Sequence, residues 1–575
     1  MAHPQLAELF REFATLLVIT GADVFRIRAH ERAAQTLDSA PEDIALLAKE
    51  GRLRELPGVG EGMAKKIAEW FATGRIAELE ELRGSVSPAI LELMNIPGLG
   101  PKKAKLLVDT LGIASIADLE TACREQRVRP LKGMGAKSEG KILASIATMR
   151  ESRERVPLWE ARMIADRILS HLRGSGGAVE SVPTGSLRRW KETVRDLDIA
   201  AVARDPAALM ETVATMPGVV EVLARGETKT SVLFGRERFQ IDVRAVPPGS
   251  FGAALQYFSG SKEHNIRLRE RASKMGLTVN EYGVFRVNPD GTRGEKVAGE
   301  TEESVYAALG LRWIPPELRE DRGEIEAYGA GGTPPRLVEQ GDIRGDLHCH
   351  TTWSDGTAGV EEMARAAEAR GYAYLAITDH SPTAAYAGGL TPDRLRRQWD
   401  EIEAVQAKVK IRILRGSEVD ILAGGELDWP DAILESLDWV VASIHQRGKD
   451  DREESTRRLV RALEHPCVNA IGHPSTRRLG QRPPLDIDWE AVFEAARAHG
   501  KALEINSAPE RLDLNEVHAA RAAALGIPLV IDTDAHATGM FGNIEYGVMV
   551  ARRAGIRPGQ VLNTAAQIPD RRGRR

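Results

Sequence analysis

The sequence predicts a multidomain protein with an all-α N-terminal region, an α+β middle region and a C-terminal distorted βα barrel of seven strands. Three observations predict these classes. Gly-x-Gly turns recur between helical segments, an Asp-x-Asp pair lies in a strand of the middle region, and short apolar strands that end in histidine or carboxylate follow residue 343. At 575 residues the chain is long enough for several domains, each with its own core.

The N-terminal region has helical periodicity and repeats one short turn. Leu-Pro-Gly-Val-Gly at 56–60 recurs as Ile-Pro-Gly-Leu-Gly at 96–100 and, in a degenerate form, as Leu-Lys-Gly-Met-Gly at 131–135. Such a turn exposes the N–H groups of the next helix, which with the helix dipole can hold a DNA phosphate, although one copy alone would equally suit a plain tight turn. The repeats resemble the helix-hairpin-helix element, which contacts DNA without reading its sequence. The resemblance implies DNA contacts by Gly58, Gly60, Gly98, Gly100, Lys102 and Lys103.

The middle region carries a candidate cluster of three carboxylates. Asp196 and Asp198 lie in an apolar strand, where side chains alternate, so both carboxylates share one face. Asp242 lies in another expected strand and would complete a site for two Mg²⁺ ions. Such a site activates a primer 3′-hydroxyl and holds a triphosphate. An edge strand with a polar face is the alternative for the first two aspartates alone.

A Gly-Ser pair precedes these aspartates at a fixed offset. Gly185 and Ser186 stand at an expected helix start with Arg189 one turn further on, where they would bind the β- and γ-phosphates of a nucleotide. Together with the three aspartates they resemble the nucleotidyltransferase palm of family X DNA polymerases, the group that contains DNA polymerase beta. The resemblance implies dNTPs as substrates and Mg²⁺ in the palm.

The resemblance extends downstream to Tyr-Phe-Ser-Gly-Ser at 257–261. In the family this segment binds the nucleotide, with two aromatic residues against the sugar that disfavour a ribose and an asparagine on the base. Two core aromatics would be the plainer interpretation of the first two positions. Lys262 stands where mammalian relatives carry an acidic residue, so the contacts of this segment with base and phosphates stay open. The nucleotide-binding residues implied are Tyr257, Phe258, Gly260, Ser261, Lys262 and Asn265.

Upstream, Lys66 aligns with a lysine that some family X members use as a Schiff-base nucleophile against an abasic-site sugar. Such a lysine must be unprotonated near neutral pH, which burial or cationic neighbours such as Lys65 can bring about. A phosphate contact is the simpler role for a lysine on a helix after a hairpin.

Histidine- and carboxylate-bearing segments recur through the C-terminal part, and nearly every one follows a short apolar run. Runs that predict buried strands cover 343–347, 374–378, 411–416, 439–443, 469–472, 502–505 and 529–531, each before a stretch long enough for a helix. In a βα barrel the carboxyl ends of the strands meet at one mouth. The candidate metal ligands there are His348, His350, Asp355, His380, Glu418, His445, His473, Asp534 and His536.

Any one of these histidines could be an ordinary surface or core residue, but their recurrence at strand ends favours a site with two or three divalent ions. The nine positions resemble the three-metal pattern of the PHP (polymerase and histidinol phosphatase) domain. The resemblance implies that Glu418 bridges two ions, that His348, His350 and Asp534 share the first, His445 and His473 the second, and Asp355, His380 and His536 the third. Family members hydrolyse phosphoesters, and those attached to polymerases act as 3′–5′ exonucleases. Mn²⁺ and Zn²⁺ are the expected ions, with Fe²⁺ open.

Composition sets further limits. The net charge of −5 gives no global basic signature, so DNA contacts must come from local clusters. Three cysteines are too few for a disulfide framework, and no apolar run reaches the roughly 18 residues that cross a bilayer. The N-terminus lacks the pattern of a secretion signal. We expect a cytoplasmic monomer without membrane partners.

The whole chain resembles a bacterial family X DNA polymerase of the PolX type with a C-terminal PHP domain. The implied function is gap filling in DNA repair on gapped or primed duplexes, coupled to 3′–5′ trimming of DNA ends and to abasic-site cleavage. A phosphatase with a vestigial polymerase half and a non-catalytic DNA-end scaffold are the alternatives. The expected boundaries are 1–85 for a helical DNA-binding domain, 86–157 for a second hairpin domain, 158–250 for the palm, 251–314 for a nucleotide-selecting subdomain, 315–343 for a flexible linker and 344–575 for the PHP domain.

Overall fold

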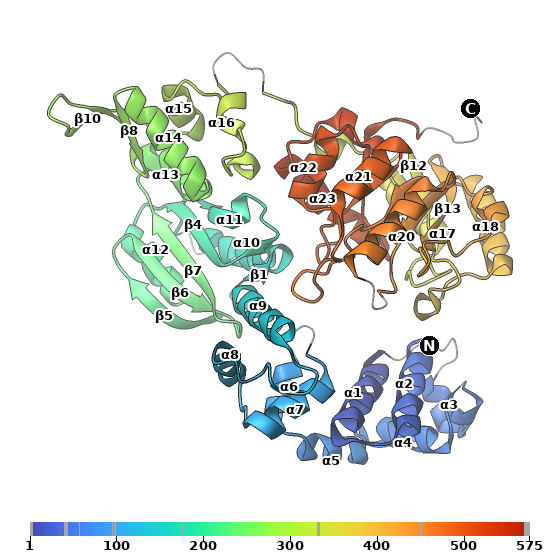
Figure 1. The fold of residues 1–575 in the computed structure, drawn as a ribbon. Helices are drawn as coiled ribbons and strands as arrows, with labels where there is room; N and C mark the ends of the chain where they lie inside the picture. The colour runs from blue at the N-terminus through green and yellow to red at the C-terminus, as the bar shows by residue number, and fades with distance from the viewer. Residues whose placement is uncertain are drawn as a thin grey trace. The chain divides into compact units, whose positions relative to one another are not determined.

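The computed structural model describes residues 4–39, 44–56, 58–94, 96, 99–153, 155–174, 177–329, 334–447 and 451–568. Contacts divide the chain into two compact units, residues 1–154 with 385–388, and residues 155–384 with 389–575. Figure 1 shows helices throughout the blue segments and mixed helices and strands from β1 onward. No helix among the described residues has the length and apolar content that a membrane span requires.

The described residues of the first unit before 154 form helices joined by turns and loops, with no strand among them. One apolar cluster reaches from Leu6 to Ile146, so the core is continuous across the boundary expected near residue 85. The helices of this unit are α1 (Pro4–Thr20), α2 (Val24–Ser39), α3 (Ile44–Glu50), α4 (Glu61–Thr73), α5 (Ala77–Ser85), α6 (Pro88–Met94), α7 (Pro101–Leu111), α8 (Ile116–Arg124) and α9 (Ala136–Arg153), with a short turn η1 (Leu53–Glu55).

The second unit begins with a five-stranded sheet in the order β2-β4-β7-β6-β5. Its strands are β2 (Glu180–Pro183), β4 (Asp196–Val202), β5 (Val219–Arg225), β6 (Lys229–Phe234) and β7 (Phe239–Ala245). Strands β4 and β7 run parallel, whereas the other neighbours are antiparallel. Helices α10 (Leu158–Gly174) and α12 (Pro206–Ala214) contribute to its core. The short strands β1 (Val156–Pro157) and β3 (Thr193–Val194) form an antiparallel pair, and the single turn α11 (Gly185–Arg188) lies between them in the sequence.

A smaller subdomain follows, with a three-stranded antiparallel sheet. It comprises η2 (Pro248–Ser250), α13 (Phe251–Ser259), α14 (Lys262–Lys274), β8 (Leu277–Asn280), β9 (Gly283–Val287), β10 (Arg293–Ala298) and α15 (Glu302–Ala308). The predicted linker is structured over its first half: η3 (Pro316–Leu318) and α16 (Glu324–Ala327) pack Leu318, Ile325 and Tyr328 into the core of this subdomain. The absence of periodicity at 315–329 therefore reflects short helical turns rather than a free tether.

The C-terminal part is the predicted seven-stranded parallel barrel, with strands in sequential order. The strands are β11 (Gly345–Asp346), β12 (Tyr374–Ile377), β13 (Arg412–Asp420), β14 (Trp439–Ser443), β15 (Ala470–Ile471), β16 (Ala502–Asn506) and β17 (Leu529–Asp532). The helices are α17 (Val360–Ala369), α18 (Pro392–Gln406), α19 (Asp431–Leu434), α20 (Arg452–Glu464), α21 (Trp489–Ala498), α22 (Glu516–Ala524) and α23 (Ile544–Arg553), with turns η4 (Gln340–Asp342), η5 (Ala385–Ala387), η6 (Thr538–Asn543), η7 (Pro558–Gln560) and η8 (Leu562–Thr564). A bridge between Cys349 and Ala535 joins the ends of the first and last strands, so the barrel is nearly closed.

Candidate functional site

Eight of the nine predicted ligands lie in or directly after a barrel strand. Glu418 lies within β13, and the histidines and Asp534 follow the carboxyl ends of β11, β12, β14, β15 and β17. Asp355 comes from the loop between β11 and α17. Because the strands are parallel, their carboxyl ends bring these side chains to one mouth.

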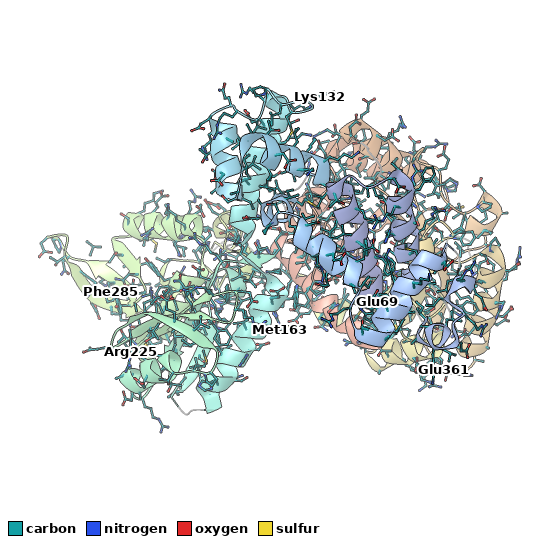
Figure 2. All side chains as sticks on the ribbon, turned by 90° about the horizontal axis from the view of Figure 1, so that it is seen from below. Glu69, Lys132, Met163, Arg225, Phe285 and Glu361 are labelled. Atoms are coloured by element: carbon teal, nitrogen blue, oxygen red, sulfur yellow. The ribbon has the colours of Figure 1, made fainter. Side chains whose placement is uncertain are left out.

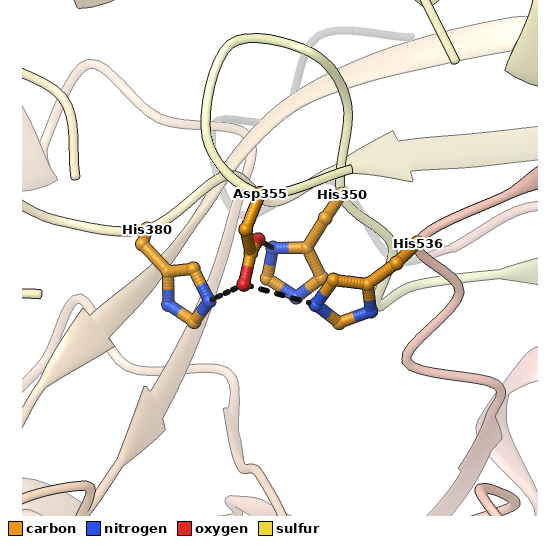
Figure 3. A group of neighbouring side chains, drawn as sticks. All are labelled: His350, Asp355, His380 and His536. Carbon is orange, nitrogen blue, oxygen red and sulfur yellow. Dashed lines mark ion pairs between the residues drawn. The ribbon is translucent and has the colours of Figure 1, made fainter. Parts of the chain in front are cut away.

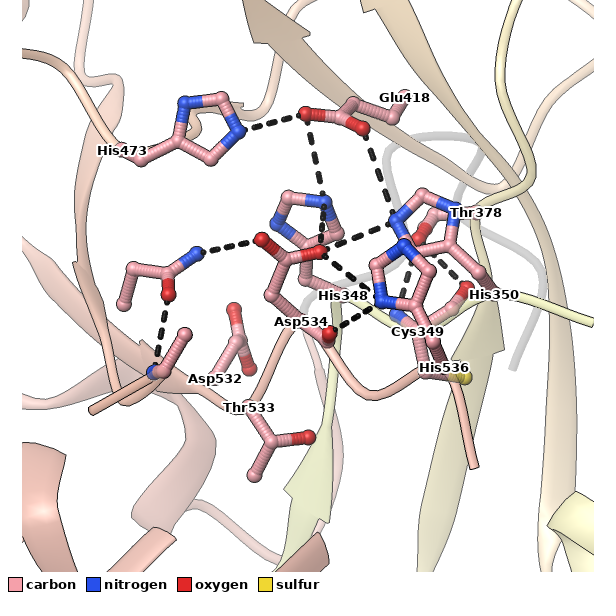
Figure 4. Close-up of polar contacts among 12 residues, drawn as sticks. His348, Cys349, His350, Thr378, Glu418, His473, Asp532, Thr533, Asp534 and His536 are labelled. Atoms are coloured by element: carbon pink, nitrogen blue, oxygen red, sulfur yellow. Dashed lines mark hydrogen bonds and ion pairs between the residues drawn. The ribbon is translucent and has the colours of Figure 1, made fainter. Parts of the chain in front are cut away.

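Glu418 is the centre of this cluster. Its Oε1 lies 2.9 Å from Nε2 of His473, 3.2 Å from Nε2 of His445 and 3.4 Å from Nε2 of His348. Its Oε2 lies 3.0 Å from Nδ1 of His380. Figure 4 shows the carboxylate facing imidazoles from several strands. A single buried carboxylate that faces several imidazoles is suited to bridge ions.

Asp355 is a second carboxylate that faces several histidines, as Glu418 does. Its Oδ2 lies 3.3 Å from Nε2 of His536 and 3.5 Å from Nε2 of His380, and its Oδ1 lies 3.7 Å from Nδ1 of His350 (Figure 3). The Oδ1 of Asp534 lies 3.2 Å from Nε2 of His350, so Asp534 also belongs to this group of side chains. All nine predicted ligands therefore belong to one continuous cluster.

The donors of this cluster fit divalent transition ions. Both ring nitrogens of His350, Nε2 of His348 and Oε1 of Glu418 are buried without a hydrogen-bond partner, as expected of atoms that ligate an ion. Four overlapping groups have donor atoms within 4.8 Å of one another: His348, His350 and Asp534; His350, Asp355, His380 and His536; His348, Glu418 and His473; and His380, Glu418 and His445.

The first two groups contain the sets expected for the first and third ions, the latter with His350 added. The expected pair His445 and His473 does not form a group of its own; each joins Glu418 with a different histidine. The assignment of ligands to individual ions therefore stays a prediction.

Electrostatics keep the carboxylates of the cluster ionised. Burial raises the pKa of Glu418, but the facing imidazoles of His445, His348 and His380 outweigh this effect and hold the pKa well below its usual range. Asp534 likewise has a lowered pKa, since His348 and its other cationic neighbours outweigh burial. Ionised carboxylates among imidazoles form a donor set for cations.

Two carboxylates that the sequence analysis did not single out hold ligand histidines in place. Oε1 of Glu504, on β16, lies 2.7 Å from Nδ1 of His348, and Oδ1 of Asp420, on β13, lies 3.0 Å from Nδ1 of His445. Each contact directs Nε2 of the ring toward Glu418. An ionisable residue inside an apolar strand was the available signal in both cases.

A buried cation adjoins the same cluster. Arg511 is 7% exposed, its Nε lies 3.5 Å from Oδ2 of Asp534, and its Nη1 has no hydrogen-bond partner. A guanidinium with a free donor suits an anionic group such as a phosphate. Its loop position between β16 and α22 gave no periodic signal in the sequence.

The three aspartates of the middle region come together on neighbouring strands. Asp198 on β4 is the direct partner of Asp242 on β7 in the parallel ladder, and Asp196 lies two residues before Asp198 on the same face. Gly185, at φ +63°, places its Cα so that a Cβ there would lie 3.4 Å from Oδ2 of Asp198. The Gly-Ser turn thus adjoins the carboxylates, as the sequence predicts.

The electrostatics of this cluster favour a bound cation. Burial, with the nearby charges of Asp196 and Asp242, raises the pKa of Asp198 to about 6. Nζ of Lys229, which sequence reasoning missed, lies 2.6 Å from Oδ2 of Asp242 and supplies a positive charge there. Three carboxylates that repel one another form a donor set suited to a divalent cation, whose charge would relieve that repulsion.

The expected nucleotide segment forms the end of α13 and the start of α14. Tyr257 and Phe258 pack edge to face with ring centroids 5.3 Å apart. Nδ2 of Asn265 donates to the carbonyl oxygen of Tyr257 at 2.7 Å, and a Cβ at Gly260 would come within 2.8 Å of the Asn265 side chain. Ser261 caps α14, and Lys262 is its exposed first residue. In this structure Asn265 braces the turn, so its contact with a base stays a prediction.

Arg189 was expected to bind a nucleotide phosphate, but in this structure its guanidinium is bonded to other protein groups. Its Nε donates to Oε1 of Glu320 at 2.9 Å and its Nη1 to the carbonyl oxygen of Ser259 at 2.7 Å. The guanidinium is thereby committed to protein partners in this structure. A phosphate contact by Arg189 requires these bonds to open.

The predicted hairpin turns precede helices. Gly58 has φ +76°, Gly60 is the N-cap of α4, and Gly100 is the N-cap of α7 with exposed Lys102 and Lys103 in its first turn. Gly98 lies outside the described residues. Side chains of this unit, with Lys132 of the third turn among them, are drawn in Figure 2.

Lys66 lies on α4 in the first unit, and its side chain is mostly buried among charged and aromatic neighbours. Its Nζ lies 2.7 Å from Oε2 of Glu78 and 3.3 Å from Nε2 of His30, and it sits over the ring of Phe13. The ion pair with Glu78 suits an ammonium group, whereas a Schiff-base nucleophile must be a neutral amine. The lyase role stays a prediction that this carboxylate opposes.

Comparison with known families agrees with this geometry. A helix-hairpin-helix domain matches residues 1–76, a SAM-like helix-hairpin-helix tandem 90–148, the DNA polymerase beta thumb 254–320 and the PHP domain 346–508.

Among individual proteins, the chain is similar to the DNA polymerase/3′-5′ exonuclease PolX of Bacillus subtilis (strain 168), with 38% identity over 565 residues, which cover 98% of this chain and 97% of the relative. A probable phosphatase of Thermoanaerobacter sp. (strain X514) is 34% identical over 232 residues, 38% of this chain and 89% of the relative. A probable phosphatase of Syntrophotalea carbinolica is 28% identical over 236 residues, again 38% of this chain.

Proposed function

Because the chain belongs to the PolX family of DNA polymerases with an attached PHP domain, we propose that it fills short gaps in damaged DNA and trims the 3′ ends it extends. It is a family X DNA polymerase with a 3′–5′ exonuclease. The observation that carries the proposal is the presence of two separate ligand clusters, Asp196, Asp198 and Asp242 in the palm and nine ligands in the barrel.

At the palm, the three aspartates would hold Mg²⁺, which activates the primer 3′-hydroxyl and neutralises the triphosphate. Lys229 forms an ion pair with Asp242 in this structure, and this ion pair must break when Asp242 binds an ion. Gly185 and Ser186 are the proposed phosphate ligands, supported by the closeness of Gly185 to Asp198. Tyr257 and Phe258 would provide an apolar wall for the sugar.

At the barrel, the nine ligands would hold Mn²⁺ or Zn²⁺, which supplies an activated water and polarises the scissile phosphodiester. The chain itself contributes Glu504 and Asp420, which orient ligand histidines, and Arg511, whose free donor is available to a phosphate oxygen. The bond broken would be that between phosphorus and the 3′ oxygen of the penultimate nucleotide, with release of a nucleoside monophosphate.

A one-nucleotide-gapped duplex with a labelled primer tests both activities in one tube. With all four dNTPs and Mg²⁺ or Mn²⁺ the primer should lengthen, and without dNTPs it should shorten to nucleoside monophosphates. A primer that changes length under neither condition would remove the proposal.

Phosphomonoester hydrolysis is a second candidate for the barrel, because the two probable phosphatases match a region of the size of this domain. A primer with a 3′-phosphate distinguishes the candidates: a phosphatase releases inorganic phosphate and leaves the strand length unchanged, whereas an exonuclease shortens the strand. Abasic-site cleavage by the same centre is a further proposal that a duplex with one abasic site would test.

A further inference from the structure

The last barrel helix, α23, ends in an arginine that contacts the polymerase part of the same compact unit. The side chain of Arg553 is only 3% exposed. Its Nη1 donates to the carbonyl oxygen of Arg189 and, at 3.2 Å, to Oε1 of Glu320, while its Nη2 donates to Oε1 of Glu516 at 2.9 Å. One barrel residue is thus bonded to the palm, to the segment after the nucleotide-selecting subdomain and to α22.

These bonds continue to the nucleotide segment. The same Oε1 of Glu320 accepts from Nε of Arg189, and Nη1 of Arg189 donates to the carbonyl oxygen of Ser259, next to Gly260 and Ser261. A guanidinium, a carboxylate and a second guanidinium therefore form a continuous series from the barrel to the turn between α13 and α14.

The series is buried rather than a loose surface contact. The side chains of Arg189 and Glu320 are 12% and 11% exposed. Burial raises the pKa of Glu320, but Arg189 and Arg553 outweigh it, so the pKa lies below its usual range. Buried ion pairs with complete hydrogen bonding fix one geometry, because each partner left alone would be a desolvated charge.

We infer that Arg553 is a positioning residue for nucleotide addition: through Glu320 and Arg189 it holds the turn at Ser259 in the arrangement that receives a dNTP. The inference rests on the polymerase function proposed above, and it adds that the barrel supports the other active site through a contact that involves none of the predicted metal ligands of the barrel.

Primer extension and exonuclease assays on Arg553→Met test this inference. Loss of a charged hydrogen bond predicts that the KM for dNTP rises about tenfold, while kcat/KM for 3′-end removal and the KM for gapped DNA stay within about twofold of the wild-type values. Arg553→Lys keeps the positive charge but loses the planar guanidinium whose two Nη atoms donate to different partners, so an intermediate KM for dNTP is expected. Arg557→Met, which removes an exposed arginine of the same region, is the matched control and should leave all values unchanged.

Glu320→Gln provides a second route, should Arg553→Met fail to fold. It should raise the KM for dNTP in the same direction, and the double variant should add little to either single change, because both act through one series of bonds. A folded Arg553→Met or Glu320→Gln protein with a wild-type KM for dNTP would overturn the inference, as would a parallel loss of both activities. A wild-type enzyme that does not extend primers would instead overturn the proposed polymerase function.

Discussion

At the scale of single residues, the barrel site depends on carboxylates that do not themselves count among the predicted ligands. Glu504 is 1% exposed, and besides its contact with His348 its Oε2 accepts from the backbone N–H of His473 and from Nδ2 of Asn506. It thereby fixes two ligand histidines at once. In other metal sites, removing a partner of this kind lowers the metal affinity by roughly 10- to 100-fold.

Replacing Glu504 tests this role. Glu504→Ala should weaken Mn²⁺ binding by about 10- to 100-fold, whereas Glu504→Gln, which keeps an acceptor oxygen for Nδ1–H of His348, should weaken it less. The metal-free protein is titrated with Mn²⁺, and the concentration of unbound Mn²⁺ at each step is measured by electron paramagnetic resonance. The resulting binding curve gives the dissociation constant for Mn²⁺. An alanine variant that binds as tightly as the wild-type protein would show that Glu504 does not orient His348.

The palm carboxylates give a pH dependence with a defined sign. Because the pKa of Asp198 is raised to about 6 without an ion, a proton competes with Mg²⁺ increasingly as the pH falls toward 6 and below. The Mg²⁺ concentration for half-maximal primer extension should therefore rise as the pH is lowered from 8 to 6, and added Mg²⁺ should restore the rate. A half-saturating concentration that does not change with pH would contradict this competition.

At the scale of elements, the strands and turns that carry side chains to the sites were predictable. The apolar runs at 374–378, 439–443 and 529–531 became β12, β14 and β17 because short buried strands have a strong composition signal. The run 469–472 was predicted as a strand in the same way, and only two of its residues form β15. The turn α11 was expected as a helix start from the Gly-Ser motif, since so few residues have no periodicity of their own.

Tertiary contacts were less accessible to sequence reasoning. Nothing local in the sequence links Arg189 to Glu320, or Lys229 to Asp242, because these pairs come from different elements. The stretch 315–329 was expected to be a flexible tether because its proline and glycine residues predict a loop. Instead, Leu318 and Tyr328 pack against the apolar core of the preceding subdomain, a contact that local sequence patterns do not reveal.

The α7 hairpin gives a prediction at this scale. Removing both exposed charges in Lys102→Ala with Lys103→Ala should weaken DNA binding and reduce the slope of log affinity against log salt by about 1 to 2, since each phosphate contact releases counterions. Lys408→Ala with Lys410→Ala, two exposed lysines of the barrel, is the control and should leave the slope unchanged. An unaltered slope in the hairpin variant would remove this hairpin from the DNA contact.

At the scale of the whole molecule, one chain combines a centre that forms phosphodiester bonds with a centre that breaks them. The three predicted palm ligands lie on β4 and β7, and the nine predicted barrel ligands come from residues 348–536, so the two predicted ligand sets have no residue in common. The presence of both centres was predictable from their motifs. The bonds of Arg553 to the palm were not, because they depend on how the folded parts of one unit pack.

The most direct measurement of this central claim is the fate of a labelled primer in a one-nucleotide-gapped duplex with two single variants. Asp198→Ala should abolish extension with dNTPs and leave shortening largely intact, because it removes only the palm ligand. His348→Ala should abolish shortening and leave extension largely intact. Loss of both activities in each variant, with circular dichroism showing that both are folded, would contradict two separate centres.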